Sequence, residues 1–316
     1  MIKKHNIKPL DSFYLDCEFN NIASILLSIE PLLISELKIN CYRYYSEIRE
    51  AKSGVKFNRL VVHFMYSLMN NRLKKMNSVY YNGKDDLVAK LRKVIDNSMY
   101  ALARVDLYDY IPRSICYHKY HWYHFSLIIG YDDEKDIFCV FDDDYHGYRE
   151  FEVSSEKLYQ AIKRSHYSDA VFYVDFCQTM FPKKIECFEL KKNARRIIRD
   201  IKKIKQEKYY IMSEEDYKIG FDRELTIIMF EKIRNRQIIN VQLFEELILN
   251  KMLREDEGTQ LIKYGNNIID EWNTLKNMFY MVYERKYEMA DINNSIISVL
   301  ERERKMWKLF LKVVRK

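Results

Sequence analysis

The stretch Cys17-Glu-Phe-Asn-Asn-Ile-Ala-Ser-Ile-Leu-Leu-Ser-Ile29 sets the fold that we expect for this chain. Its apolar residues recur with the spacing of a helix, and a cysteine stands at the first position. A thiol attacks as the thiolate, and the unpaired N–H groups of a first helical turn stabilise negative charge there. Asp16, directly before it, is a residue type that caps helices. The stretch therefore predicts a helix that carries a nucleophile at its start.

A histidine and an aspartate much later in the chain complete the pattern. His124 opens the apolar run Phe125-Ser-Leu-Ile-Ile-Gly130, which is typical of a buried strand. After a polar turn, the run Ile137-Phe-Cys-Val-Phe141 returns antiparallel and brings Asp142 beside the His124 end. A carboxylate there would hold the second ring nitrogen of the histidine and stabilise its charged form. We therefore predict a catalytic triad of Cys17, His124 and Asp142.

Alternatives remain open at each of these positions. Cys17 by itself is also compatible with a small buried side chain, which is the usual place of a cysteine. His121 is expected in a loop near the site, and a metal site built on two histidines has no obvious third ligand. Asp144 is the reserve for Asp142, because alternate residues of a strand share a face. The six cysteines form no Cys-x-x-Cys pair, so neither a disulfide framework nor any metal or cofactor is predicted.

The composition indicates a soluble protein of mixed structure. Of the 316 residues, 48% are hydrophobic and 31% are charged, a balance typical of globular domains. Only 7 glycines and 4 prolines interrupt the chain, which favours long helices with a modest sheet over an all-β fold. The N-terminal residues lack the apolar segment of a secretory signal, and no run reaches the ~18 apolar residues that cross a membrane. We expect an α+β protein of the cytoplasm with no membrane partner.

The patterns divide the chain near Pro182 into a catalytic domain of residues 1–184 and a helical domain of residues 185–316. The first part contains strand-like runs at residues 99–108, 124–130, 137–141 and 170–175. The second part has helical spacing almost throughout, with a predicted helix start at Ser213-Glu-Glu-Asp216 and a connection at Gly258. The periodic apolar residues are Leu190, Ala194, Ile197, Ile198, Ile201, Ile204, Leu261, Ile268, Ile269, Trp272, Leu275 and Phe279.

One basic segment stands out in the helical part. Residues 191–208 contain nine basic residues, Lys191, Lys192, Arg195, Arg196, Arg199, Lys202, Lys203, Lys205 and Lys208, against Asp200 and Glu207. This segment is either an ordinary solvated helix face or a docking surface for an acidic partner protein. No nucleic-acid-binding module accompanies the charge, so no nucleic-acid partner is predicted.

Several of these residues together resemble a known family. The matching pattern is Cys17 at the head of its helix, Arg104-Val-Asp-Leu-Tyr-Asp-Tyr-Ile-Pro112, His121-x-x-His124 with Gly130-Tyr-Asp-Asp133 after it, and Val140-Phe-Asp142. It is similar to the N-terminal domain of the butirosin biosynthesis protein H family over roughly residues 10–180. The histidine-bearing strand followed by Gly-Tyr-Asp-Asp is the most specific part.

The resemblance implies a papain-like fold and an acyltransferase activity in specialised-metabolite biosynthesis. An aminoacyl or peptidyl group would pass from a thioester on an acyl carrier protein to the cysteine, and then to a small-molecule or peptide amine. Nucleophile, base and orienting residue carry over to Cys17, His124 and Asp142. Carrier proteins are commonly acidic, so residues 191–208 would be the surface that receives one.

The chain departs from related papain-like peptidases at the oxyanion site. Those enzymes place a glutamine about six residues before the cysteine, where this chain has Asp11. The expected donors are therefore the backbone N–H of Cys17 together with Asn20, Asn21 or Ser12. Two other functions stay open: a cysteine peptidase or amidase with water as the acceptor, and a non-catalytic scaffold that keeps the fold.

Overall fold

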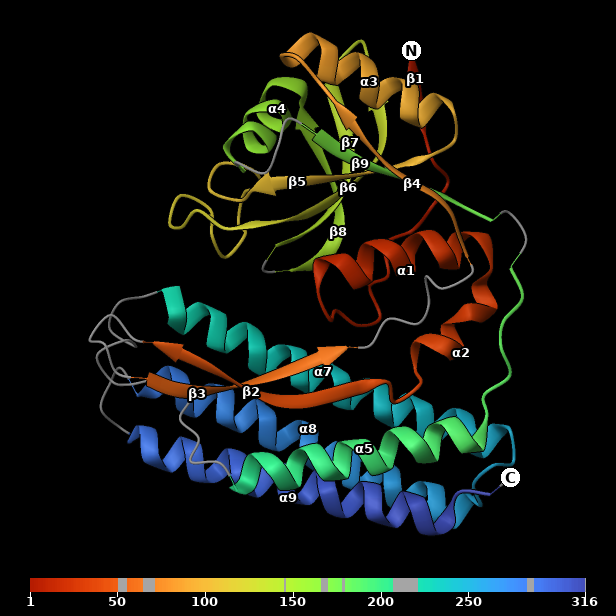
Figure 1. The fold of residues 1–316 in the computed structure, drawn as a ribbon, viewed down its shortest axis with the longest axis vertical. Coiled ribbons are helices and arrows are strands. Elements are labelled where there is room, and N and C mark those ends of the chain that lie inside the picture. The colour runs from red at the N-terminus through yellow and green to blue at the C-terminus, as the bar shows by residue number, and fades with distance from the viewer. Residues whose placement is uncertain are drawn as a thin grey trace. The chain divides into compact units, whose positions relative to one another are not determined.

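The computed structural model describes residues 1–50, 56–64, 72–144, 146–165, 170–177, 180–206, 221–282 and 287–315. Helices and strands are mixed, and the strands of the main sheet pair antiparallel, as an α+β fold requires (Figure 1). The chain divides into two compact units, and each unit is built from two separate segments. The first unit comprises Met1–Ile34 and Ser67–Pro182, and the second comprises Ser35–Tyr66 and Lys183–Lys316.

A seven-stranded sheet forms the centre of the first unit. Its strands are β1 (Ile2–Lys4), β4 (Leu73–Tyr80), β5 (Tyr100–Asp106), β6 (Tyr123–Asp132), β7 (Ile137–Asp144), β8 (Gly147–Ser154) and β9 (Ala170–Phe176). The order is β4-β9-β5-β6-β7-β8, and β1 pairs with the C-terminal end of β6. β5, β7 and β9 coincide with three of the predicted strands, and β6 with the fourth, which carries His124. β6 and β7 are antiparallel, so the beginning of β6, which contains His124, lies beside the end of β7, which contains Asp142.

Three helices pack around this sheet. α1 (Cys17–Ile29) packs against β6 and β7, whereas α3 (Lys84–Asp96) and α4 (Ser155–Arg164) pack on each other and on β5. A short 3-10 turn, η1 (Pro31–Leu33), and α2 (Ile34–Leu37) follow α1. The apolar face of α1 is buried at Phe19, Ile22, Ile25 and Leu26, which explains why its sequence has helical spacing. The helix that Cys17 begins is therefore anchored on the two strands that carry its predicted partners.

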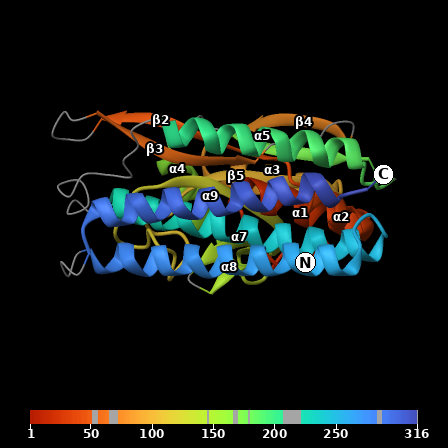
Figure 2. The ribbon, with the colours of Figure 1, turned by 90° about the horizontal axis from the view of Figure 1, so that it is seen from below.

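The second unit is a layer of helices with a β-hairpin on it. The hairpin is formed by β2 (Tyr42–Glu50) and β3 (Lys56–Phe64), and the helices are α5 (Cys187–Gln206), α7 (Phe221–Leu249), α8 (Glu255–Met281) and α9 (Met289–Val313). α7, α8 and α9 run alongside one another (Figure 2). α8 contacts both α7 and α9, and the hairpin contacts α5 and α7. No helix in the described ranges is long and apolar enough to cross a membrane.

Buried hydrogen bonds to one carboxylate, Glu303 of α9, hold the hairpin on the helices. Tyr44 donates its hydroxyl to Glu303 at 2.8 Å, and Tyr42 donates at 2.5 Å to the other carboxylate oxygen. Trp307 donates its ring N–H to the same carboxylate and to the Tyr42 hydroxyl. Burial raises the pKa of Glu303, while the donated hydrogen bonds act against this rise. The hairpin is thus an integral part of the second unit.

This arrangement differs from the predicted domains. The predicted boundary after residue 184 lies close to the observed division after Pro182, but residues 35–66 belong to the second unit and not to the first. The second unit is consequently not all-α. The reason is the long-range burial of Tyr42 and Tyr44 against Glu303, a partner that no local pattern shows.

The predicted helical periodicity of the C-terminal part is confirmed with one correction. Most of the periodic apolar residues are buried, for example Ile197 in α5 and Trp272 in α8. Gly258, however, lies in the first turn of α8 and not in a connection. A Cβ atom there would meet the side chain of Ile248 at 2.3 Å, so close packing of α7 and α8 explains the glycine. The predicted helix start at residues 213–216 lies outside the described residues.

Candidate active site

The start of α1 places the thiol of Cys17. Cys17 is the first residue of the helix, and Asp16 before it has the extended backbone of an N-cap. The Asp16 carboxylate accepts the backbone N–H of Phe19 at 2.8 Å, and its carbonyl accepts that of Asn20 at 2.9 Å. The predicted helix start and its cap are therefore both present. The backbone N–H of Cys17 itself is left without a partner inside the helix.

The segment that leads into α1 is fixed by the side chain of Asn20. Its amide oxygen accepts the N–H of Leu15 at 3.0 Å, and its amide nitrogen donates to the carbonyls of Leu10 and Phe13 at 3.0 and 2.9 Å. Both amide hydrogens are used by this buried network. Asn20 is consequently a structural residue, and its expected role as an oxyanion donor is wrong.

Asn21 has a similar bridging role one residue later. Its amide nitrogen donates to the carbonyl of Phe125 in β6 at 2.9 Å, and its oxygen accepts the Tyr148 hydroxyl of β8 at 2.6 Å. These bonds hold α1 at a set position on the sheet. One amide hydrogen of Asn21 and the backbone N–H of Cys17 are left over by these bonds, so both remain expected oxyanion donors, whereas Ser12 is exposed.

The sheet brings His124 and Asp142 together as predicted. Nε2 of His124 lies 2.9 and 3.1 Å from the two carboxylate oxygens of Asp142. The His124 side chain is 8% exposed and that of Asp142 is fully buried. Asp144, the reserve, is used elsewhere: it accepts the N–H of His146 at 2.8 Å and pairs with Arg149. Asp142 is therefore the carboxylate that orients the imidazole.

The thiol of Cys17 completes the cluster. The thiol lies close enough to the His124 ring to raise the pKa of that ring, and since Asp142 occupies Nε2, the nitrogen that remains for sulfur is Nδ1. Burial of His124 opposes its charged form, but the charge and hydrogen bond of Asp142 and the hydrogen bond and charge of Cys17 outweigh burial. The pKa of His124 is raised well above its ordinary value. The geometry thus favours the charged form of the imidazole beside the sulfur.

A second carboxylate, Asp143, stands beside the same ring and was not predicted. Its Oδ1 lies 3.7 Å from Nδ1 of His124 and accepts the Tyr14 hydroxyl at 3.0 Å. Burial raises the pKa of Asp143 to about 6; the charge of His124 acts against this, and that of Asp142 adds to it. Strict alternation along β7 would turn Asp143 away from the Asp142 face. β7 pairs with β6 only up to Phe141, so its last residues have a neighbour on one side alone.

His124, Asp142 and Asp143 also have the donor types that divalent cations accept. One ligand atom from each lies within 4.8 Å of the others. A cation would have to replace the hydrogen bond between Nε2 and Asp142, or displace the Cys17 thiol from Nδ1. The raised pKa of His124 favours the protonated ring, and a protonated ring nitrogen cannot coordinate a metal. The arrangement is therefore better suited to proton transfer than to metal binding.

His121 lies in the loop between β5 and β6, as expected, but does not contact the triad. Its Nδ1 is 2.6 Å from the buried carboxylate of Asp106, and its ring stacks on Tyr108 at a centroid distance of 4.5 Å. His118 pairs separately with Asp109 at 3.1 Å. These contacts fix the loop, so a role of His121 in orienting the site is not supported by its bonds.

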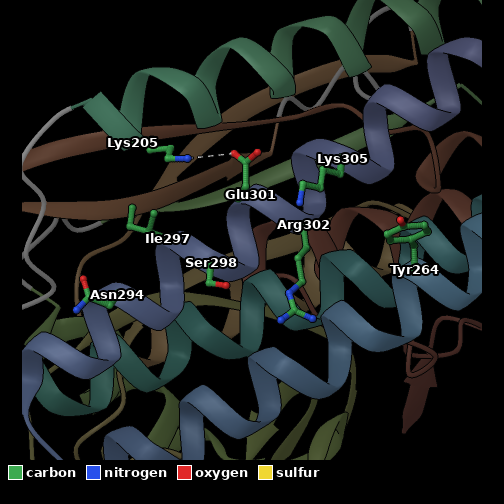
Figure 3. A pocket seen from close by; sticks show the side chains of 8 residues that line it. All are labelled: Lys205, Tyr264, Asn294, Ile297, Ser298, Glu301, Arg302 and Lys305. Atoms are coloured by element: carbon green, nitrogen blue, oxygen red, sulfur yellow. Dashed lines mark ion pairs between the residues drawn. The ribbon is translucent and has the colours of Figure 1, made fainter.

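The second unit contains a hollow of about 560 Å³ between α5, α8 and α9 (Figure 3). Two of the three cations that line it are paired, Lys205 with Glu301 at 3.6 Å and Arg302 with Glu271 at 2.5 Å. The lining contains no thiol and no imidazole, so the hollow does not offer the chemistry of the triad. The lining residues are Lys205, Tyr264, Asn294, Ile297, Ser298, Glu301, Arg302 and Lys305.

Comparison with known proteins adds no family to this geometry. No model of a known protein family matches the chain, and no curated protein matches it. What the site can do therefore follows from its own residues: a thiol at a helix start, an imidazole held by a buried carboxylate, and a second carboxylate within reach of the same ring.

Proposed function

We propose that this protein is a papain-like cysteine acyltransferase that works through an acyl-enzyme on Cys17. The observation that carries the proposal is the continuous chain of contacts from the Cys17 thiol to His124 and from His124 to Asp142. These are the roles of nucleophile, base and orienting group in cysteine enzymes. The placement of α1 against the antiparallel strands β6 and β7 supports a papain-like fold for the first unit.

The proposed reaction begins with transfer of an acyl group to the thiol. The Cys17 thiolate attacks the carbonyl carbon of a carrier-protein thioester, and the C–S bond to the carrier breaks. His124 gives its proton to the departing thiol, and Asp142 keeps the ring oriented throughout. One thioester replaces another, so this step is close to neutral in free energy. An amine acceptor then takes the acyl group from Cys17 and forms an amide.

The donor is proposed to be an acyl carrier protein that docks on α5. Four cations of α5, Lys192, Arg195, Arg199 and Lys202, follow one another at intervals of three or four residues and so share one face of the helix. All four are exposed, and none has an ion pair or hydrogen bond within the described residues. Two other basic residues have partners, Arg196 with Asn193 and Lys205 with Glu301. The α5 stripe, as we call these four residues, is charge-complementary to an acidic protein.

Mass spectrometry of the intact protein tests the acyl-enzyme. Incubation with acyl thioesters of N-acetylcysteamine and of an acyl carrier protein should add the acyl mass to wild type and not to Cys17→Ala. Cys187→Ala is the matched control, because Cys187 also heads a helix, α5, but has no hydrogen bond to a histidine within the described residues. It should acylate like wild type. Acylation of Cys17→Ala would contradict the proposal.

The same incubations separate the rival functions. Release of free acid with every amine, together with cleavage of peptides, would indicate a cysteine peptidase or amidase. Full biological activity of Cys17→Ala would indicate a scaffold. For the docking surface, reversing charge at Arg195 and Arg199 to glutamate should slow acylation by the carrier thioester and leave that by the small thioester unchanged.

A further inference from the structure

The carboxylate of Asp143 has no part in the chemistry given so far. Its Oδ1 is 3.7 Å from Nδ1 of His124 and is bound by the Tyr14 hydroxyl. Its other oxygen has no hydrogen bond within the described part of the chain. The Asp143 side chain is 31% exposed, whereas His124 is 8% exposed and Asp142 is fully buried. Asp143 is therefore the acidic member of the cluster that a ligand can reach.

The surroundings of the thiol are negatively charged. The phenol of Tyr14 reflects this: its pKa is raised well above the ordinary value, first by burial and then by the charges of Asp143, Cys17, Asp16 and Asp142. Three carboxylates and the Cys17 thiol thus lie close enough to one hydroxyl to affect its ionisation. Such a site attracts a cationic ligand and repels an anionic one.

We propose that Asp143 receives the acceptor substrate: its carboxylate binds a primary amine as the ammonium ion and takes one proton from it beside the acyl thioester of Cys17. The inference rests on the proposed function and specifies its acceptor as a cationic amine. An aliphatic amine is protonated at neutral pH, and its neutral form is the nucleophile. A transferase of this kind needs a proton acceptor in addition to His124, because His124 has to take the second proton.

The environment of Asp143 suits this task. An ordinary aspartate and an alkylammonium ion differ in pKa by about 6, so the proton transfer between them is strongly uphill. With the pKa of Asp143 at about 6, this difference falls to about 4. The groups that face Asp143 are His124, Asp142 and Asp144 from the sheet and Tyr14 from the segment before α1.

The step balances as follows in atoms and protons. The ammonium ion gives one proton to Asp143, and the resulting amine attacks the carbonyl carbon of the acyl group on Cys17. A C–N bond forms, and the nitrogen gives its next proton to His124, which is neutral after acylation. The C–S bond then breaks, and sulfur leaves as the thiolate beside the His124 imidazolium. Asp143 finally releases its proton to solvent.

The test compares how the acyl-enzyme partitions between acceptors. Wild type, Asp143→Asn and Asp85→Asn are acylated with butanoyl N-acetylcysteamine and given 1,3-diaminopropane, which is cationic at pH 7.5, or hydroxylamine, which is neutral there. We expect Asp143→Asn to lower the ratio of diaminopropane amide to hydroxamate at least tenfold relative to wild type, with both products counted per acyl-enzyme formed. Asp85 is an exposed residue of α3, so Asp85→Asn makes the same charge change and should behave like wild type.

Calorimetry on the unacylated protein provides a readout that does not need acylation. Wild type should bind 1,3-diaminopropane, and Asp143→Asn should bind it at least tenfold more weakly. Equal ratios of amide to hydroxamate in wild type and Asp143→Asn would overturn the proposal, and so would equal diaminopropane binding or none. Failure of wild type to acylate would count against the proposed function alone, and calorimetry would still decide the role of Asp143.

Discussion

Nε2 of His124 faces both carboxylate oxygens of Asp142, at 2.9 and 3.1 Å, in the least exposed part of the site. This pairing separates the two ring nitrogens: Nε2 is held by Asp142, and Nδ1 is the nitrogen left for the Cys17 sulfur. The partner of Nε2 is a charged group that is fully buried. Loss of this charge should therefore disturb the orientation and the charged form of the ring more than loss of any neighbouring charge.

Asp142→Asn should slow acylation of Cys17 by about 10²- to 10⁴-fold, the range that an oriented general base contributes. The amide has the shape of the carboxylate but cannot stabilise an imidazolium. The rate of Cys17 alkylation by iodoacetamide, followed against pH, measures the effect on the thiolate directly. Asp144→Asn is the control, since Asp144 pairs with Arg149. A larger loss in Asp144→Asn would show that the orienting residue is misassigned.

The raised pKa of His124 makes stability depend on pH. Because the folded pKa lies above the unfolded value of about 6.5, the charged ring stabilises the fold fully below that pH, and the contribution is lost as pH rises through the folded pKa. Wild type should therefore lose unfolding free energy relative to His124→Gln above pH 6.5, by up to about 1.4 kcal/mol per pH unit. Denaturant unfolding at several pH values measures this slope. If the stability advantage of wild type over His124→Gln grew as the pH rose, the ion pair between His124 and Asp142 would be contradicted.

Asn20→Ala should lower the free energy of unfolding by about 2–4 kcal/mol. The substitution leaves the carbonyls of Leu10 and Phe13 and the N–H of Leu15 without their partner, and unsatisfied buried groups cost about 1–3 kcal/mol each before relaxation. Asn97→Ala, which removes an exposed amide with one bond to the Lys93 carbonyl, serves as the matched control. Equal effects of the two substitutions would mean that the lead-in segment does not depend on Asn20.

The hairpin of the second unit offers a paired test on adjacent tyrosines. Tyr44→Phe removes a buried 2.8 Å hydrogen bond to Glu303 and should cost about 1.5–3 kcal/mol of stability, as for bonds to charged groups. Tyr45 follows on the same strand with its side chain 42% exposed, so Tyr45→Phe should change stability by less than about 0.5 kcal/mol. Chemical denaturation measures both. Equal costs would argue against Glu303 as the anchor of the hairpin.

Local signals account for the parts of the site that the sequence predicts. The start of α1 depends on Asp16 and on apolar spacing within one helix, and the meeting of His124 with Asp142 depends on one hairpin. Asp143 was missed because the prediction assumed that side chains alternate strictly between the two faces of β7. Pairing on both sides of a strand enforces this alternation, and β7 is no longer paired with β6 after Phe141. The bonds of Asn20 to carbonyls 7 and 10 residues earlier have no sequence pattern of their own.

The fold was predicted where periodicity decides it and not where distant burial does. The strands of the first unit and the helices of the second follow their apolar patterns. The placement of residues 35–66 depends on Tyr42 reaching a carboxylate 261 positions later, and a pattern read along the chain cannot contain that information. The position of Gly258 was predicted wrongly for the same reason. The glycine is explained by close packing against Ile248, which belongs to another helix.

The separation between Tyr42 and Glu303 has a consequence for biosynthesis. A ribosome adds about 5–20 residues per second, so on the order of 10–50 seconds pass between the emergence of the hairpin and that of its anchor. Throughout that interval Tyr42 and Tyr44 lack their carboxylate partner in α9, although α5 and α7, which also contact the hairpin, are made earlier. The hairpin can therefore complete its buried hydrogen bonds only when translation is almost finished, so the second unit closes late in synthesis.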